Sequence, residues 1–130
     1  MTVIDASAFV TAVASSSGHT SAAQLLQQSV LRAPAHFDVE VVSALRGLAK
    51  AGRFSPQGCL EAIAILQDLR IEREPHGPLL ERIWELRHNL TPYDAAYVAL
   101  AEALGVPLVT GDRRLAQAPG TRCRVELVEG

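Results

Sequence analysis

Residues 2–14 read TVIDASAFVTAVA, a short β-branched run followed by an aspartate and an apolar helical stretch. The same order returns later in the chain, where residues 106–116 read VPLVTGDRRLA. Short apolar strands that lead directly into helices are typical of a parallel sheet covered on both faces, because such strands have no solvent side. These two stretches therefore predict an α/β protein with a mostly parallel sheet.

The segments between these two stretches alternate in the same way. Apolar residues recur there at helical spacing, and short apolar runs bounded by turn residues lie between the helical segments. Helices are expected over residues 20–28, 37–51, 55–69, 78–88 and 95–104. Further strands are expected over residues 30–33, 71–74 and 125–128. Since no linker or charge block divides the chain, the prediction is a three-layer sandwich, with residues 1–130 forming a single domain.

The composition is that of an ordinary globular protein, with 48% hydrophobic residues, 20% charged residues and a formal net charge of −2. This balance excludes a broad, non-specific nucleic-acid coat, which needs a large positive excess, but it leaves a small local site open. Cys59 and Cys123 lack metal or redox spacing, so reduced thiols are expected.

Nothing in the sequence indicates a membrane or secreted protein. No apolar run approaches the ~18 residues of a membrane span. Residues 6–14 superficially resemble a secretion signal, but an aspartate precedes them and no Lys or Arg occurs before Arg32. A signal peptide requires a positive start, so we expect a cytoplasmic protein that is mature from Met1 and has no membrane partner.

Four acidic residues stand where chemistry is expected in such a sheet. Asp5 and Asp112 follow predicted strands, and Glu40 and Asp94 lie near predicted helix starts. Sites in open α/β sheets form beyond the carboxyl ends of the strands. Converging carboxylates repel one another and raise their pKa values, a repulsion that Mg²⁺ or Mn²⁺ relieves.

Each acid also fits a purely structural role. Asp5 and Asp112 fit helix N-caps, and Asp94 follows Thr91 at the spacing of a capping box. Glu40 fits a solvated position on an amphipathic helix. Spacing alone does not decide between the two interpretations.

The sequence around the acids resembles the PIN domain over essentially the whole chain. The resemblance rests on VIDASA at residues 3–8, Glu40 in the helix after the second strand, DAAYVALA at 94–101 and TGDRRL at 110–115. Each motif is weak alone, whereas the ordered set is specific. The resemblance is strongest to VapC, the toxin of bacterial VapBC toxin–antitoxin pairs.

This resemblance implies a metal-dependent endoribonuclease that a VapB antitoxin holds inactive. The carboxylates that it implies to be catalytic and to bind one or two Mg²⁺ or Mn²⁺ ions are Asp5, Glu40, Asp94 and Asp112. It also implies that Ser7 and Thr110 orient carboxylates or water. A homodimer, and an antitoxin that binds beside the acids through an apolar helix and a basic side chain, are further implications.

Phosphodiester hydrolysis is chemically consistent with such a site, because carboxylate-bound metal ions activate water and clamp the phosphate without a side-chain nucleophile. Apart from the four acids, 10 acidic residues stand against 12 basic ones, so the negative charge is local. Arg113 and Arg114 are the candidate phosphate contacts. Arg46, Lys50 and Arg53 are predicted to share a helix face, for which a solvated basic face is the preferred interpretation.

The histidines and aromatic residues carry no recognisable motif. The histidines are expected at the surface or in loops, without metal-ligand spacing: His19, His36, His76 and His88. Core positions are expected for three aromatic residues, Phe9, Trp84 and Tyr97. Phe37 and Phe54 are left open, since an exposed phenylalanine would suit a contact with a partner.

Two other functions remain open on the sequence. One is a PIN-like structure-specific DNA nuclease, because nothing in the sequence identifies a contact to the 2′-hydroxyl of RNA. The other is a non-catalytic binding module whose acids only cap helices. Phosphoaspartyl-transfer proteins fit less well, because Ser7 stands where the phosphatases of that class have a second aspartate. The single lysine, Lys50, is predicted mid-helix, whereas receiver domains need a lysine at a strand end.

Overall fold

A five-stranded sheet, parallel throughout, forms the centre of the computed structural model, which describes residues 1–14, 21–28 and 30–129. The strands lie in the order β3-β2-β1-β4-β5. Their bounds are β1 Thr2–Ile4, β2 Leu31–Pro34, β3 Ile71–Glu74, β4 Leu108–Thr110 and β5 Val125–Leu127. Nearly every side chain of the three inner strands is buried, which explains their short, continuously apolar sequences.

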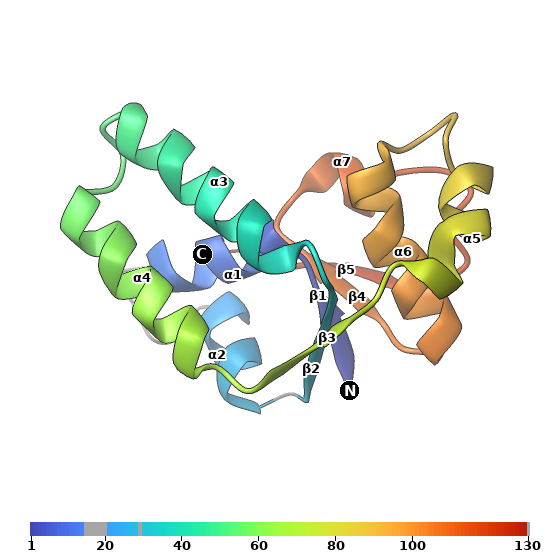
Figure 1. Ribbon diagram of the computed structural model, residues 1–130, viewed down its shortest axis with the longest axis horizontal. Coiled ribbons are helices and arrows are strands. Elements are labelled where there is room, and N and C mark those ends of the chain that lie inside the picture. Colours follow the sequence, from blue (N-terminus) through green and yellow to red (C-terminus); the bar gives the residue numbers. More distant parts are fainter. Residues whose placement is uncertain (15–20, 29, 130) are drawn as a thin grey trace.

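Helices cover both faces of this sheet (Figure 1). One face is covered by α1 (Ala6–Ala14), α2 (Ser21–Gln28), α3 (Phe37–Lys50) and α4 (Pro56–Asp68). The other is covered by the 3₁₀ turn η1 (Gly77–Leu79), α5 (Leu80–Glu85) and α6 (Pro92–Leu104). The short helix α7 (Arg113–Ala116) follows β4 at the end of the sheet. The predicted three-layer α/β sandwich is confirmed.

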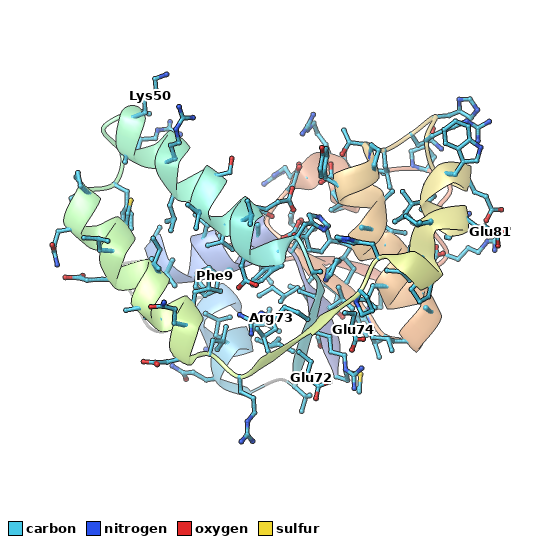
Figure 2. The ribbon with its side chains drawn as sticks, viewed as in Figure 1. Phe9, Lys50, Glu72, Arg73, Glu74 and Glu81 are labelled. Atoms are coloured by element: carbon cyan, nitrogen blue, oxygen red, sulfur yellow. The ribbon has the colours of Figure 1, made fainter. Side chains whose placement is uncertain are left out.

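The two layers of helices are packed in different ways. Every residue from Ala95 to Ala101 of α6 is buried, as expected for a helix enclosed between the sheet and α5. On the opposite face, Phe9 of α1 meets Phe37 of α3 edge-to-face, with ring centroids 6.1 Å apart. In the view of Figure 2, Phe9 lies between α3 and α4, and it is fully buried. Because Phe37 is fully buried, it is not available for a partner.

The order of the strands creates one place for a site. From β1 the chain adds β2 and β3 on one side, and then crosses by way of α6 to add β4 and β5 on the other. The connections leaving β1 and β4 therefore diverge at their shared carboxyl edge. Such a topological switch point is where α/β sheets bind ligands.

Local sequence signals explain where several helices begin and end. Ser55 caps α4 by accepting a hydrogen bond from the backbone N–H of Gly58, 2.9 Å away. Thr91 caps α6 in the same way, so this helix begins at Pro92 rather than at residue 95. At its other end Gly105 takes a left-handed conformation, with φ of 67°.

The helix predicted over residues 78–88 is wrong in detail. A 3₁₀ turn occupies Gly77–Leu79, and α5 ends at Glu85. Trp84, predicted in the core, is 66% exposed, and the guanidinium of Arg87 lies 4.3 Å from its ring centroid. A helix of fewer than two turns buries few side chains. The apolar spacing of residues 78–88 therefore predicted a larger buried face than α5 has.

The basic helix face predicted from Arg46, Lys50 and Arg53 is also wrong. Helix α3 ends at Lys50, and Arg53 follows the turn at Gly52, whose φ is 71°. In Figure 2, Lys50 extends into solvent from the far tip of α3.

A smaller difference concerns the start of one strand. Val30 is exposed and lies outside β2. The expectations for His19, the break at residues 15–18 and the helix start at residue 20 lie outside the described residues. Cys59 and Cys123 are free thiols, as expected. Among the described residues, no helix is long and apolar enough to cross a bilayer.

Candidate active site

The four predicted acids lie together at the carboxyl edge of the sheet. Asp5 follows β1 and Asp112 follows β4, while Glu40 and Asp94 occupy the first turns of α3 and α6. All four line one cavity of about 270 Å³. The remaining lining residues are Ala6, Ser7, Ser43, Ala44 and Tyr97. Four separate segments of the chain thus contribute carboxylates to a single space.

Asp5 is the most buried of these acids, with 5% of its surface exposed. Its Oδ1 accepts hydrogen bonds from the hydroxyl of Ser7 at 2.7 Å and the N–H of Ala8 at 2.9 Å. Its Oδ2 accepts one from the hydroxyl of Thr110 at 2.5 Å. Burial raises the pKa of Asp5 to about 6, although these three hydrogen bonds lower it, and the charge of Asp94 adds to the rise.

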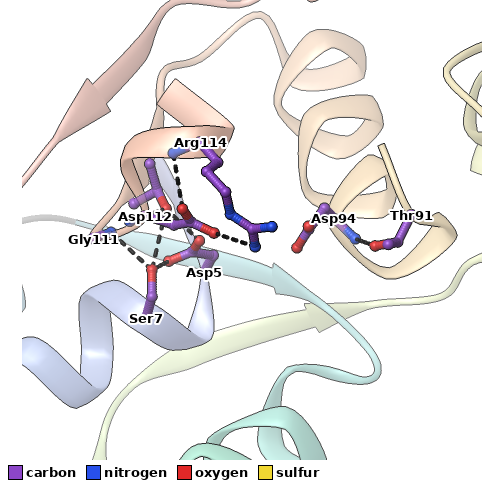
Figure 3. A network of polar contacts seen from close by, with 8 residues as sticks. Asp5, Ser7, Thr91, Asp94, Gly111, Asp112 and Arg114 are labelled. Carbon is purple, nitrogen blue, oxygen red and sulfur yellow. Dashed lines mark hydrogen bonds and ion pairs between the residues drawn. The ribbon is translucent and has the colours of Figure 1, made fainter. Parts of the chain in front are cut away.

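The hydroxyls of Ser7 and Thr110 join the start of α1 to the loop after β4. They lie 3.1 Å apart, and each accepts a backbone N–H, from Gly111 at 2.8 Å and from Asp112 at 3.0 Å. Figure 3 shows this network converging on Asp5. A Cβ on Gly111 would lie 2.9 Å from the hydroxyl of Thr11 and 3.2 Å from the carbonyl oxygen of Ser7, so a larger residue would force these neighbours to shift.

Asp112 caps a helix with one carboxylate oxygen and pairs with an arginine through the other. Its Oδ1 caps α7 by accepting the N–H of Arg114 at 2.9 Å, which is the structural role that the sequence also allowed. Its Oδ2 lies 3.5 Å from the guanidinium of Arg114. In Figure 3 this guanidinium lies between Asp112 and Asp94. Burial raises the pKa of Asp94, as do the charges of Glu40 and Asp112, and Arg114 offsets part of the rise.

The two consecutive arginines point to different places. Arg114 is solvent-exposed and reaches over the acids, whereas Arg113 forms an ion pair of 3.5 Å with Glu129. Arg113 lines a separate recess that also includes Thr11 and Leu127. Of the two candidate phosphate contacts, the structure brings only Arg114 to the acidic cavity.

Glu40 has two partners that sequence reasoning missed. The Tyr97 hydroxyl donates a hydrogen bond of 2.5 Å to its Oε1, and Nε2 of His36 lies 3.3 Å from the same oxygen. Burial by itself would raise the pKa of Glu40, but the interactions with His36 and Tyr97 outweigh it, and the net pKa is lowered. The same contact, together with burial, raises the pKa of Tyr97.

Two of the histidines lie in loops, as expected, and contact each other there. Nδ1 of His36 lies 2.7 Å from Nε2 of His76, and their ring centroids are 4.9 Å apart. Burial, together with the charge of His36, lowers the pKa of His76. Helical spacing could have indicated part of this cluster, because His36 precedes Glu40 by four residues and Tyr97 follows Asp94 by three.

The donor atoms around the cavity suit a hard divalent cation, since they are carboxylate and hydroxyl oxygens. Within the described ranges, no three His, Cys, Asp or Glu side chains are grouped closely enough to form a complete metal cage. Mg²⁺ does not need one, because it keeps several waters and takes only about one or two protein carboxylates together with substrate phosphates. The cavity therefore fits an ion that shares its coordination sphere with water and phosphate.

The comparisons with known proteins agree with this arrangement. The PIN domain family matches residues 2–120. Ribonuclease VapC1 of Mycobacterium tuberculosis is 46% identical over 128 residues, which cover 97% of this chain and 96% of the relative. The chain belongs to the VapC group of PIN-domain proteins. Ribonuclease VapC12 of the same organism is 41% identical, over 98% of this chain and 99% of the relative.

Solved structures share the PIN fold. PAE2754 from Pyrobaculum aerophilum superposes with a TM-score of 0.70 and 25% identity, over 96% of this chain and 82% of that one. M. tuberculosis VapC20, described as a toxin that cleaves the sarcin–ricin loop, has a TM-score of 0.64 and 22% identity, over 93% and 96%. VapBC2 of Rickettsia felis, solved with a DNA fragment from its promoter, has a TM-score of 0.67 and 14% identity, over 98% of both chains.

Proposed function

We propose that this PIN-domain protein is a metal-dependent endoribonuclease and the toxin of a VapBC-type pair. Asp5, Glu40, Asp94 and Asp112 are its proposed catalytic, metal-binding carboxylates. The observation that carries the proposal is that these acids, from four distant segments, line one cavity of about 270 Å³ at the switch point of the sheet. The names of its VapC relatives support RNA over DNA as the substrate.

The four acids are the proposed holders of one or two Mg²⁺ or Mn²⁺ ions. When bound there, such an ion supplies a water molecule of lowered pKa and neutralises phosphate charge. Ser7 and Thr110 hold the carboxylate of Asp5 in a single orientation. The raised pKa values of Asp5 and Asp94 reflect burial and repulsion by neighbouring carboxylates, and a bound cation would offset the first and relieve the second.

Arg114 is the proposed phosphate contact. Its guanidinium is exposed at the mouth of the cavity, and among the described residues its side chain is held by the 3.5 Å ion pair with Asp112. Exposed pairs of this kind contribute little stability, so an incoming phosphate can take over the guanidinium at low cost. Arg114 thus provides local positive charge on a chain whose net charge is −2.

A VapB-type antitoxin and a second copy of the chain are the proposed protein partners, and the cytoplasm is the proposed location. Helix α3, which carries Glu40, exposes Val39 and Val42, and the adjacent α4 exposes Leu60 and Ile65. These side chains would suit an apolar antitoxin helix beside the acids. A second exposed apolar group would suit the homodimer: Leu80, Trp84 and Tyr93.

The test is cleavage of a mixed pool of structured and single-stranded RNAs by the purified protein, with Mg²⁺, with Mn²⁺ and with chelator. Asp5→Asn and Asp94→Asn are the test variants. Asp68→Asn is the matched control, because Asp68 is an exposed acid at the end of α4, outside the cavity. Metal-dependent cutting that only the control retains supports the proposal.

Other outcomes would contradict it. Cleavage that survives both site substitutions would come from a contaminant or a different site. Equal cleavage of single-stranded DNA would favour a PIN-like DNA nuclease. Absence of both cleavage and metal-dependent stabilisation would leave the acids as helix caps on a binding module.

A further inference from the structure

Glu40 is held through only one of its two carboxylate oxygens. The Tyr97 hydroxyl donates to Oε1 at 2.5 Å, and Nε2 of His36 lies 3.3 Å from that same atom. Within the described part of the chain, neither contact involves Oε2. Because Glu40 lines the acidic cavity, this arrangement leaves Oε2 free for a ligand there.

Two further contacts, with Tyr93 and His76, hold the ring of His36. Its Nε2 also lies 3.2 Å from the backbone carbonyl oxygen of Tyr93, and a carbonyl oxygen can only accept. Nε2 must therefore carry a hydrogen. On the other side of the ring, Nδ1 of His36 lies 2.7 Å from Nε2 of His76, so one of these two nitrogens donates and the other accepts. The carbonyl of Tyr93 therefore fixes the hydrogen on Nε2, and His76 holds the ring of His36 through the opposite nitrogen.

These groups come from three separate segments, which makes the arrangement stiff. His36 immediately precedes α3, His76 immediately precedes η1, and Tyr93 and Tyr97 are on α6. The ring of His36 lies 5.0 Å from that of Tyr97 and 6.0 Å from that of Tyr93, measured between centroids. Tyr97 is almost fully buried, so its hydroxyl has little freedom to turn elsewhere.

We infer that His36 and Tyr97 are positioning residues, which hold Oε1 of Glu40 so that Oε2 faces the cation-binding cavity, with His76 supporting the ring of His36 through Nδ1. This inference rests on the proposed metal-dependent function. Partners that orient a ligand carboxylate commonly alter metal affinity about 10- to 100-fold when they are removed. A Tyr97 hydroxyl that merely satisfied its own burial would change stability without changing metal affinity.

The experiment measures Mn²⁺ affinity, from the electron paramagnetic resonance signal of free Mn²⁺, together with kcat and KM on RNA. Tyr97→Phe removes one oxygen atom, and His36→Phe keeps a ring but removes the donor. His36→Gln restores an N–H close to the position of Nε2. The control is His88→Gln, because His88 is exposed in the turns after α5 and is not part of the cluster.

The expected result for Tyr97→Phe and His36→Phe is Mn²⁺ affinity at least about tenfold weaker than in the wild type, with kcat reduced and KM for RNA unchanged. His36→Gln is expected to recover most of the affinity, and His88→Gln to match the wild type. Should His36→Phe fail to fold, Tyr97→Phe decides the matter alone.

Wild-type affinity and kcat in folded Tyr97→Phe and His36→Phe would overturn the inference while leaving the proposed function intact. Equal losses in His36→Phe and His36→Gln would also overturn it, because the donor would then be irrelevant. A wild-type protein that neither binds Mn²⁺ nor cleaves RNA would instead overturn the proposed function, and the positioning role with it.

Discussion

Asp5 and Thr110 are joined by a hydrogen bond of 2.5 Å, although 105 positions separate them in the sequence. Each lies at the carboxyl end of a central strand, Asp5 after β1 and Thr110 at the end of β4. The bond ties a buried carboxylate to the neighbouring strand. As a result, the acidic cavity and the middle of the sheet form one structural unit.

The burial of Asp5 predicts that its removal stabilises the metal-free protein. Its pKa in the folded state, about 6, lies above its ordinary value of 3.8. Folding therefore favours the protonated form, and this stabilisation, complete below pH 3.8, is lost as the pH rises through 6. Asp5→Asn, which carries no charge, should exceed the wild type at pH 8 by up to about 3 kcal/mol in free energy of unfolding.

The measurement is urea unfolding in chelator between pH 4 and 8, and the difference should shrink toward pH 4. Asp68→Asn controls for the loss of an exposed charge and should show no such trend. An Asp5→Asn protein less stable than the wild type at pH 8 would show that the hydrogen bonds to Asp5 outweigh its burial.

Crowding of the acids predicts that divalent cations stabilise the fold. The charges of Glu40 and Asp112 contribute to the raised pKa of Asp94, and a bound cation would remove that repulsion. At a Mn²⁺ concentration of about 100 times its Kd, the gain should be about 2.7 kcal/mol, seen as a higher Tm. Asp94→Asn should lose most of this shift; a full shift in that variant would place the ion elsewhere.

The close approach at Gly111 predicts that even a methyl group there damages the site. A Cβ would lie 2.9 Å from the hydroxyl of Thr11 and 3.2 Å from the carbonyl oxygen of Ser7. Gly111→Ala should therefore cost about 1–3 kcal/mol of stability, and it should reduce RNA cleavage by displacing Asp112.

Gly47→Ala is the matched control for that substitution, because a Cβ at this position in α3 meets no atom within 4 Å. It should be neutral or stabilising by up to about 1 kcal/mol, as alanine favours helix. Unfolding and cleavage assays on both variants compare the two glycines. Unchanged cleavage in Gly111→Ala would mean that the loop after β4 tolerates displacement.

The two arginines after Asp112 should differ in their effect on RNA binding. Arg114 reaches over the acids, and Arg113 instead pairs with Glu129. Arg114→Gln should raise KM for RNA several-fold and reduce the slope of log KM against log salt concentration by about 1, whereas Arg113→Gln should change both much less. Equal effects of the two substitutions would argue for a diffuse electrostatic contribution.

The strands before the acids and the helix caps could be predicted from the sequence, because one local rule governs each of these short segments. The runs before Asp5 and Asp112 are buried on both sides, and parallel strands place their carboxyl ends on one edge, so the meeting of these acids follows from topology. The caps at Ser55 and Thr91 also follow from local chemistry.

The remaining features depend on packing between distant segments. Apolar spacing in α5 did not reveal that Trp84 faces solvent, because that depends on how much of a short helix the neighbouring α6 covers. The pairing of His36 with His76 joins a helix start to a turn 40 residues away, and neither residue lies in a motif. Tyr97 was assigned to the core, where it is, but burial alone did not identify Glu40 as its partner.

The position of β4 between β1 and β5 has a consequence for synthesis of the protein. A ribosome makes Asp5, Glu40 and Asp94 before it reaches Thr110 and Asp112. A chain made only as far as Asp94 therefore lacks the part of the cavity lining that Asp112 supplies. On that side of the sheet β1 pairs with β4, so this edge of β1 has no strand partner until β4 has been made. On the proposed function, a nascent chain therefore lacks a complete acidic site until translation has passed residue 112 and β4 has docked beside β1.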